Sequence, residues 1–221
     1  MAPSDSVKRA PRNTINREIL VEKATEIADE VGLAGFSIRV LADSLGVKPM
    51  AVYTHVKNKD ELLTLIVDQV FASIYAPQPG ENWEAELTRA ANSKRAALLQ
   101  HPWALAVMES RRDPGPYSMK HHEAVLAAIK ASGASLGAIA HGYALFDAYI
   151  FGFVYQEIML SQIGLDEETE EVAEGLDLAE FPTMAEFVEH HALAPGYQFS
   201  HSWQPGLDTV LTGIKRFSQQ F

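Results

Sequence analysis

Residues 35–47 read GFSIRVLADSLGV, and residues 48–63 continue as KPMAVYTHVKNKDELL. Ser37 is placed to cap a short helix, because a serine hydroxyl accepts hydrogen bonds from the free N–H groups at a helix start. Gly46 ends that helix, since glycine readily adopts the left-handed conformation found at helix C-termini. Pro49 suits the first turn of a second short helix, where its missing N–H has no partner in any case. Two short helices joined by a glycine-containing turn are the pattern of a helix-turn-helix.

A further helix is predicted on each side of this pair. Residues 16–31 carry apolar side chains at helical spacing, with Asn16 as the cap and Gly32 at the end. On the other side, Asn58 caps a helix in which Glu61, three residues on, completes a reciprocal cap. The N-terminal part therefore reads as a compact helical group organised around the helix-turn-helix.

Together these stretches resemble the DNA-binding domain of the tetracycline-repressor (TetR) family, over roughly residues 14–70. The run from Tyr53 to Leu63 is similar in particular to the tetracycline-repressor branch, in which Tyr-x-His-Val-Lys-Asn-Lys is typical. The resemblance implies an all-α protein, with a three-helix helix-turn-helix domain at residues 1–60 and a larger helical effector-binding and dimerisation domain at residues 61–221. It also implies a transcriptional regulator, most simply a repressor, that binds a palindromic operator as a homodimer and whose DNA affinity a small-molecule effector alters.

The resemblance implies DNA contacts for nine residues of this segment. Contacts from Lys, Arg, Tyr and helix N-termini to phosphates fix the register, whereas contacts to base edges supply specificity. Among the groove-facing residues only Lys48 bonds guanine strongly, while Met50 and Ala51 would meet thymine methyl groups. The residues expected to contact DNA are Ser37, Arg39, Lys48, Met50, Ala51, Tyr53, Thr54, His55 and Lys59. Packing roles for Tyr53 and His55 are the alternative.

Charge is distributed unevenly along the chain, whose formal net charge is −11. Residues 1–60 contain nine Lys and Arg against eight Asp and Glu, while the remainder contains nine against twenty-one. Because the local field rather than the total charge decides whether a surface approaches phosphate, the N-terminal part is the candidate for an anionic partner. Its basic arm, with Lys8, Arg9 and Arg12, either enters a minor groove or follows the phosphates, or else serves as a solubilising tail.

Two apolar helices, Leu136–Gln162 and Leu207–Phe221, are predicted in the C-terminal part. Their apolar arcs are wide, and in the resembled family two such helices form a four-helix bundle with their symmetry mates. The residues expected at this dimer interface are Phe146, Ile150, Phe153, Leu207, Leu211, Ile214 and Phe217. A two-fold dimer would place its recognition helices about 34–36 Å apart on the operator. The alternative is that both helices form the core of a monomer.

The stretch Trp83–Phe153 is expected to hold the effector, because ligand sites are apolar hollows with a few convergent polar groups. The candidate lining residues are Trp103, Met108, Tyr117, His121, Phe146, Tyr149 and Gln156. Ala90, Lys94 and Met108 stand where the resemblance would require the polar, aromatic and metal-linked side chains of a tetracycline binder. The expected effector is therefore an apolar or aromatic molecule other than tetracycline.

The sequence offers little support for an enzymatic function. The chain has no cysteine, which excludes disulfides, thiolate catalysis and Cys-ligated zinc and suits a cytoplasmic protein. Residues 133–137 match the G-x-S-x-G elbow of hydrolases, but no strand is predicted before them, and Ser135 is expected to cap the following helix. No catalytic residue, cofactor or metal is assigned. Two alternatives stay open: a regulatory metal at Glu186 and His190, and an enzyme that has a helix-turn-helix-like segment by coincidence.

No membrane association is expected. Residues 1–20 lack the apolar core of a signal peptide. The most apolar stretch, Ala131–Phe151, contains His141 and Asp147 and falls short of a membrane span. The segment Gly164–Pro182 has eight acids and no base, which indicates a solvated segment.

Overall fold

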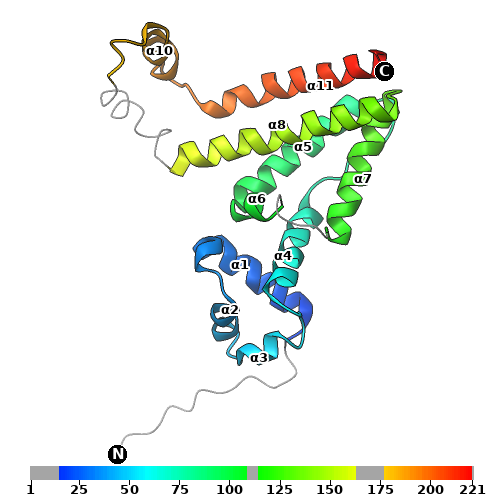
Figure 1. Cartoon of the computed structure of the whole chain (residues 1–221), viewed down its shortest axis with the longest axis vertical. Coiled ribbons are helices and arrows are strands. Elements are labelled where there is room, and N and C mark those ends of the chain that lie inside the picture. The colour runs from blue at the N-terminus through cyan, green and yellow to red at the C-terminus, as the bar shows by residue number, and fades with distance from the viewer. Residues whose placement is uncertain (1–14, 109–113, 163–176, 221) are drawn as a thin grey trace, which may run out of the picture. The chain divides into compact units, whose positions relative to one another are not determined.

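The computed structural model describes residues 15–108, 114–162 and 177–220, and all regular elements in these ranges are helices (Figure 1). The basic arm with Lys8, Arg9 and Arg12 and most of the acidic segment Gly164–Pro182 lie outside the described residues. The elements are α1 (Arg17–Gly35), α2 (Ile38–Ser44), α3 (Pro49–Val52), α4 (Lys59–Ser73), α5 (Trp83–Gln100), α6 (Trp103–Met108), α7 (Pro116–Ala131), α8 (Leu136–Gln162), α10 (Pro182–Phe187), the π-helix η1 (Val188–Ala192), the 3₁₀ helix η2 (Phe199–Ser202) and α11 (Trp203–Gln220). The expected all-α class is confirmed.

Side-chain caps begin the helices of the N-terminal part as the sequence predicts. The side-chain oxygens of Asn16, Ser37 and Asn58 each accept the amide N–H three residues on, at 2.8, 3.2 and 2.8 Å. The Glu61 carboxylate completes the last of these caps by accepting the amide of Lys57 at 2.6 Å. These bonds satisfy N–H groups that have no partner within the first turn of a helix.

Two glycines with positive φ separate the N-terminal helices. Gly32 (φ 64°) interrupts α1, so the regular part of the first helix ends where the sequence predicts and a short turn to Gly35 follows. Gly46 (φ 66°) separates α2 from α3. The short helix predicted to begin at Pro49 is α3, which ends at Val52, with Tyr53 at its C-cap. The helix is short because the chain turns there and brings Val56 into the core, where it is 3% exposed.

The chain forms two compact units. The first comprises Met1–Ile74 and Gln100–His122, and the second comprises Tyr75–Leu99 and Glu123–Phe221. The boundary predicted after residue 60 differs, because it falls at the start of α4, whereas the first unit continues to the end of that helix and takes in α6 and the start of α7. The physical reason is packing, since α4 lies against both α1 and α6.

In the second unit α11 lies along α8 (Figure 1). The bounds of α8 are those predicted from the sequence, and Ser135 caps it by accepting the amide of Ala138 at 3.2 Å. The face between α8 and α11 buries six of the seven residues expected at a dimer interface. These residues, at most 9% exposed, are Phe146, Ile150, Phe153, Leu207, Leu211 and Ile214. They form the core of the unit, because two helices of one chain already cover them, and this corrects the interface predicted from the sequence. Phe217 is half-buried, with its ring 5.9 Å from that of His141.

By length and composition alone, α8 is apolar enough to cross a membrane, whereas His141 and Asp147 in the overlapping stretch Ala131–Phe151 predict that it falls short. The central helix of a folded core passes the same test. Because α8 packs its apolar side on α11 and forms ion pairs with α5, its apolar character is explained by its place in the core of the second unit.

Candidate functional site

Four apolar side chains hold the helix-turn-helix together from inside. Phe36, Leu41, Val52 and Val56 are each at most 3% exposed. Phe36 lies just before α2 and Leu41 within it, while Val52 ends α3 and Val56 follows in the next turn. Removing these side chains from water fixes α3 against α2 and leaves the opposite side of α3 in solvent.

The solvent side of α3 presents residues predicted to contact DNA. Met50 is 72% exposed and Tyr53 is 43% exposed. The Arg39 side chain of α2 is 86% exposed, with its Nε 3.8 Å from the carboxylate of Asp43. Exposed or half-buried along the same segment are Lys48, Ala51, Thr54 and His55. The structure therefore gathers these predicted residues around one short helix.

Three of the predicted contact residues also form side-chain hydrogen bonds within the chain. Ser37 caps α2, and the Thr54 hydroxyl donates to the carbonyl of Ala51 at 2.7 Å. Lys59 Nζ donates to the carbonyl of Phe36 at 2.9 Å and lies 5.5 Å from the centroid of its ring. Lys59 thus fastens the start of α4 to the segment before α2. An ammonium group has three N–H donors, so this bond is compatible with a phosphate contact.

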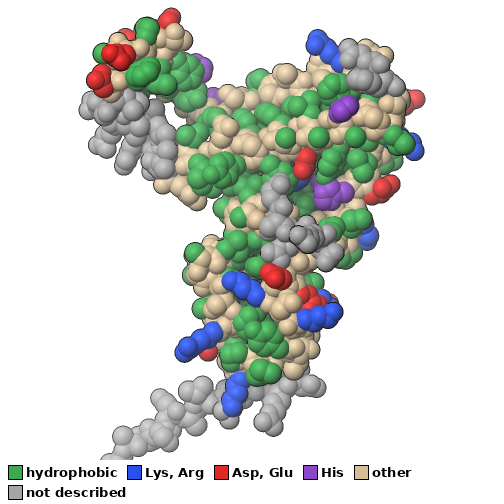
Figure 2. Space-filling view, viewed as in Figure 1, with side chains coloured by type: hydrophobic (Ala, Val, Ile, Leu, Met, Phe, Trp, Pro, Cys, Tyr) green, Lys and Arg blue, Asp and Glu red, His purple; other side chains and the backbone are tan. Residues whose placement is uncertain are grey.

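Charge on this unit favours the approach of phosphates to α2 and α3. Figure 2 shows Lys and Arg side chains on the visible face of the unit. Exposed basic residues on α2, just before α3 and around the start of α4 are Arg39, Lys48, Lys57 and Lys59. Exposed acids recur every four residues on α1, at Glu18, Glu22, Glu26 and Glu30. Because phosphates are repelled by this acidic row, the basic side around α3 is the one suited to DNA.

The seven residues predicted to line an effector site divide between the two units. The first unit contains Trp103, Met108, Tyr117 and His121, and the second contains Phe146, Tyr149 and Gln156. Trp103 is buried, and its indole N–H donates to Asp29 Oδ1 at 2.6 Å. Tyr117 and Gln156 are exposed. Phe146 belongs to the core between α8 and α11. Of the three predicted lining residues in the second unit, Tyr149 is the one that contacts a set of polar and aromatic side chains.

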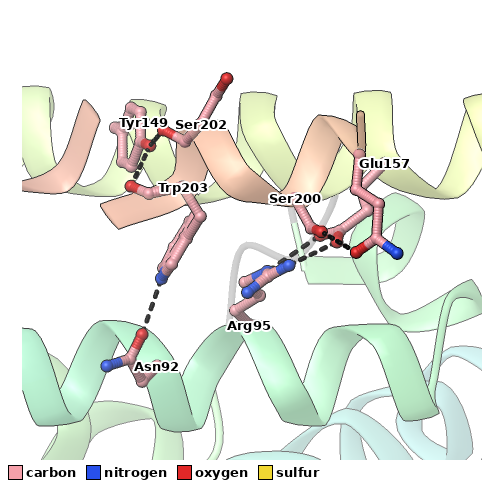
Figure 3. Close-up of polar contacts among 8 residues, drawn as sticks. Asn92, Arg95, Tyr149, Glu157, Ser200, Ser202 and Trp203 are labelled. Carbon is pink, nitrogen blue, oxygen red and sulfur yellow. Dashed lines mark hydrogen bonds and ion pairs between the residues drawn. The ribbon is translucent and has the colours of Figure 1, made fainter. Parts of the chain in front are cut away.

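That set, here named the Trp203 cluster, joins α5, α8, η2 and the start of α11, and Figure 3 shows its polar contacts. Its members are Asn92, Arg95, Tyr149, Phe153, Glu157, Phe199 and Trp203. The indole N–H of Trp203 donates to Asn92 at 2.6 Å, and the Tyr149 hydroxyl donates to the Trp203 carbonyl at 2.6 Å. Arg95 forms a two-pronged ion pair with Glu157, and its guanidinium carbon lies 5.0 Å from the centroid of the Trp203 ring.

The rings of the Trp203 cluster form two stacked pairs, which meet edge-on where Phe153 contacts Trp203. The centroids of Tyr149 and Trp203 are 5.3 Å apart, and those of Phe153 and Phe199 are 4.6 Å apart. Burial raises the pKa of the Tyr149 hydroxyl, and the charge of Arg95 offsets part of that rise. The hydroxyl therefore stays protonated near neutral pH and remains a donor. Gly206 allows this approach, because a Cβ there would lie 2.3 Å from the hydroxyl oxygen.

A buried ion pair, one residue away along α5, also joins this helix to α8. Lys94 Nζ lies 2.5 Å from Asp147 Oδ1, and the two side chains are 3% and 25% exposed. The ammonium group is also 4.2 Å from the centroid of the Phe151 ring. Sequence reasoning missed this pair, as it missed Asn92, Arg95 and Glu157 of the Trp203 cluster, because each partner lies more than 50 residues away along the chain.

The candidate metal pair from the sequence, Glu186 and His190, lies on α10 and η1. Both residues are exposed. Across the described ranges, no group of three or more His, Cys, Asp or Glu side chains is placed to hold a metal ion.

Similarity to known proteins extends over most of the chain. The family described as "Tetracyclin repressor-like, C-terminal domain" matches residues 76–217. The chain is 31% identical to the HTH-type transcriptional repressor DrrR1 of Streptomyces coeruleorubidus over 225 residues, which cover 94% of this chain and 80% of that protein. It is 37% identical over 90 residues to the class D tetracycline repressor protein of Escherichia coli, covering 39% of this chain and 41% of that one.

A solved structure shares the fold. ActR from Streptomyces coelicolor in complex with actinorhodin matches with a TM-score of 0.77 at 22% identity, covering 91% of this chain and 96% of that one. Since the likeness to DrrR1 covers 94% of this chain, the helix-turn-helix is not a coincidental feature of an unrelated protein. The chain belongs to the tetracycline-repressor family of helix-turn-helix transcriptional regulators.

Proposed function

We propose that this protein is a cytoplasmic, homodimeric repressor that binds a palindromic operator through α2 and α3, and that a small aromatic effector lowers its affinity for that operator. The observation that carries the proposal is the solvent side of α3, where Met50 and Tyr53 are exposed over a buried core and basic side chains surround them. Burying a large apolar side chain such as Met50 against DNA removes it from water and so lowers the free energy of the complex. No catalytic role is assigned to any residue.

The dimer is proposed to form through the outward face of α8. The exposed residues of this helix between Gly137 and Gln156 include no Asp, Glu, Lys or Arg. They are Gly137, Ala140, His141, Ala144, Leu145, Ala148, Gly152, Tyr155 and Gln156. Protein interfaces are depleted of charge at their centres, and small side chains let two helices approach closely. This face supports a two-fold contact that leaves the α8–α11 core intact.

The effector is proposed to bind in the second unit, which contains most of the segment matched by the C-terminal domain of the family. The ActR structure, which has a similar fold, contains bound actinorhodin. In this chain the rings of Tyr149, Phe153 and Trp203 offer stacking surfaces, and Lys94 and Arg95 supply charge beside them. These residues support an aromatic effector with polar substituents. By linkage, operator DNA must weaken effector binding by the same factor.

The test of the DNA-binding proposal is selection of bound fragments from the source genome by the purified protein, followed by footprinting. We expect a protected palindrome whose half-sites lie about 34–36 Å, or one helical turn, apart. Fragments that are not enriched over random DNA, even at low salt, would overturn the proposal.

Arg39→Ala is expected to weaken binding to all DNA sequences alike. Operator affinity should fall on the order of 10³-fold between about 50 and 200 mM salt, and the variant should reduce the logarithmic salt slope by about two, one phosphate contact per protomer. Lys215→Ala is the matched control, because this residue is an exposed base on α11, paired with Glu84. Fluorescence-anisotropy titrations over a salt series measure both slopes. A change in base preference without a change in slope would contradict the phosphate role of Arg39.

Met50 is expected to read thymine through its 5-methyl group. Replacing thymine by uracil at the contacted position removes only that methyl, and should weaken binding about fourfold per half-site, the equivalent of one buried methylene-sized group. Met50→Ala should bind the two operators with equal affinity. If no thymine in the footprint shows this effect with the wild-type protein, the apolar readout is wrong even though operator binding itself stands.

A further inference from the structure

The chain passes between its two units three times, after Ile74, after Leu99 and after His122. In the first unit, the segments next to these crossings are the end of α4, the start of α6 and the first turns of α7. The first of these segments, the end of α4, belongs to the helix that directly follows the helix-turn-helix. The other two are each held by a carboxylate that α1 or α4 supplies.

Asp29 of α1 holds the start of α6. Its Oδ1 atom accepts from the indole N–H of Trp103 at 2.6 Å and contacts His101 Nδ1 at 2.7 Å. Because a carboxylate only accepts, the Nδ1 atom of His101 is the donor in this contact. The His101 carbonyl in turn accepts the amide of Ala104, in the first turn of α6. Two donors that converge on one oxygen fix the first turn of α6 to α1 in both position and direction.

Asp68 of α4 holds the start of α7. The residue is 5% exposed, and its Oδ1 accepts the amide of Ser118 at 2.8 Å, in the first turn of α7. A carboxylate at this place satisfies a free N–H group and interacts favourably with the helix dipole. Gly115, just before the helix, permits the contact, because a Cβ there would lie 2.2 Å from the Asp68 carboxyl carbon.

We propose that Asp29 and Asp68 are positioning residues that make α6 and the start of α7 move as one body with the helix-turn-helix. The inference rests on the proposed function. The α6 segment continues directly from α5, and α7 continues into the second unit, so a shift of either helix reaches α1 or α4 through one of these carboxylates. From α4 the shift reaches the segment before α2 through the Lys59 bond to the Phe36 carbonyl, and α1 continues directly into the same segment. The same rigidity sets the spacing between the two recognition helices of the dimer.

The experiment measures selectivity for operator spacing. The wild-type protein, Asp29→Asn and Asp68→Asn are titrated against the selected operator and against versions with one base pair inserted or removed at its centre. We expect each variant to lose about tenfold of the wild-type discrimination between the selected spacing and the altered ones, the equivalent of one charge-assisted hydrogen bond. Glu30→Gln is the matched control, because it removes a negative charge from the exposed side of α1 next to Asp29; it should keep the wild-type discrimination.

Trp103→Phe keeps the test decisive where an aspartate variant fails to fold, since it removes the indole N–H donor from this bond and retains an aromatic ring. It should relax spacing selectivity in the same direction as Asp29→Asn. Equal loss of affinity for every spacing, or unchanged discrimination in folded variants, would show that the carboxylates only stabilise the first unit and would overturn the inference. Failure of the wild-type protein to select any operator would instead overturn the proposed function, so the two failures are distinguishable.

Discussion

Ala148→Glu on the outward face of α8 is expected to convert the protein into a monomer and to lower its operator affinity by about 10²–10⁴-fold, the advantage that a second linked half-site confers. Ala148 is exposed at the centre of the uncharged face of α8. A glutamate there is solvated in the free chain, so the unit still folds. In a two-fold contact, however, two carboxylates would be desolvated close to each other. Sedimentation velocity measures the mass, and anisotropy titration measures the affinity.

Ala96→Glu is the matched control for this prediction. Ala96 is also an exposed alanine within a long helix of the second unit, but it lies on α5. The control should remain dimeric and bind the operator as tightly as the wild type. A dimeric Ala148→Glu protein would show that the outward face of α8 is not the interface, whatever the outcome for DNA binding.

Lys94→Ala is expected to destabilise the second unit by about 3 kcal/mol, because it leaves the Asp147 carboxylate without its partner in a mostly buried position. The value is at the low end for buried pairs, since the Asp147 side chain is 25% exposed and water reaches part of it. The change also removes the contact between the ammonium group and the Phe151 ring. Urea unfolding followed by circular dichroism measures the shift of the midpoint.

The double change Lys94→Met with Asp147→Leu separates the charge effect from packing. Replacing both ions with apolar side chains of similar size is expected to restore most of the lost stability. Lys215→Ala, which removes an exposed pair with Glu84, should change the free energy of unfolding by less than about 1 kcal/mol. A double variant as unstable as Lys94→Ala would mean that the pair contributes through its shape and not through the uncompensated charge.

The local features of this protein can be predicted from short stretches of its sequence. Asn16, Ser37, Asn58 and Ser135 begin their helices as predicted, because a cap bonds to an amide only three residues away and its signal is contained in a short stretch. The bounds of α8 were predictable for the same reason, from a run of apolar residues that follows a cap. The helix-turn-helix was predictable because the Ser37 cap, Gly46 and the Asn58 cap follow one another in a fixed order within a short stretch.

The covered helix faces and the contacts between distant groups follow from the path of the whole chain. Periodicity showed that α8 and α11 have apolar faces, but not that the two helices cover each other within one chain. The carboxylates of Asp29 and Asp68 meet partners 72, 74 and 50 residues away along the chain. Exposed and buried aspartates look alike in a sequence, because the partner that stabilises a buried charge is chosen by the path of the chain and not by its neighbours.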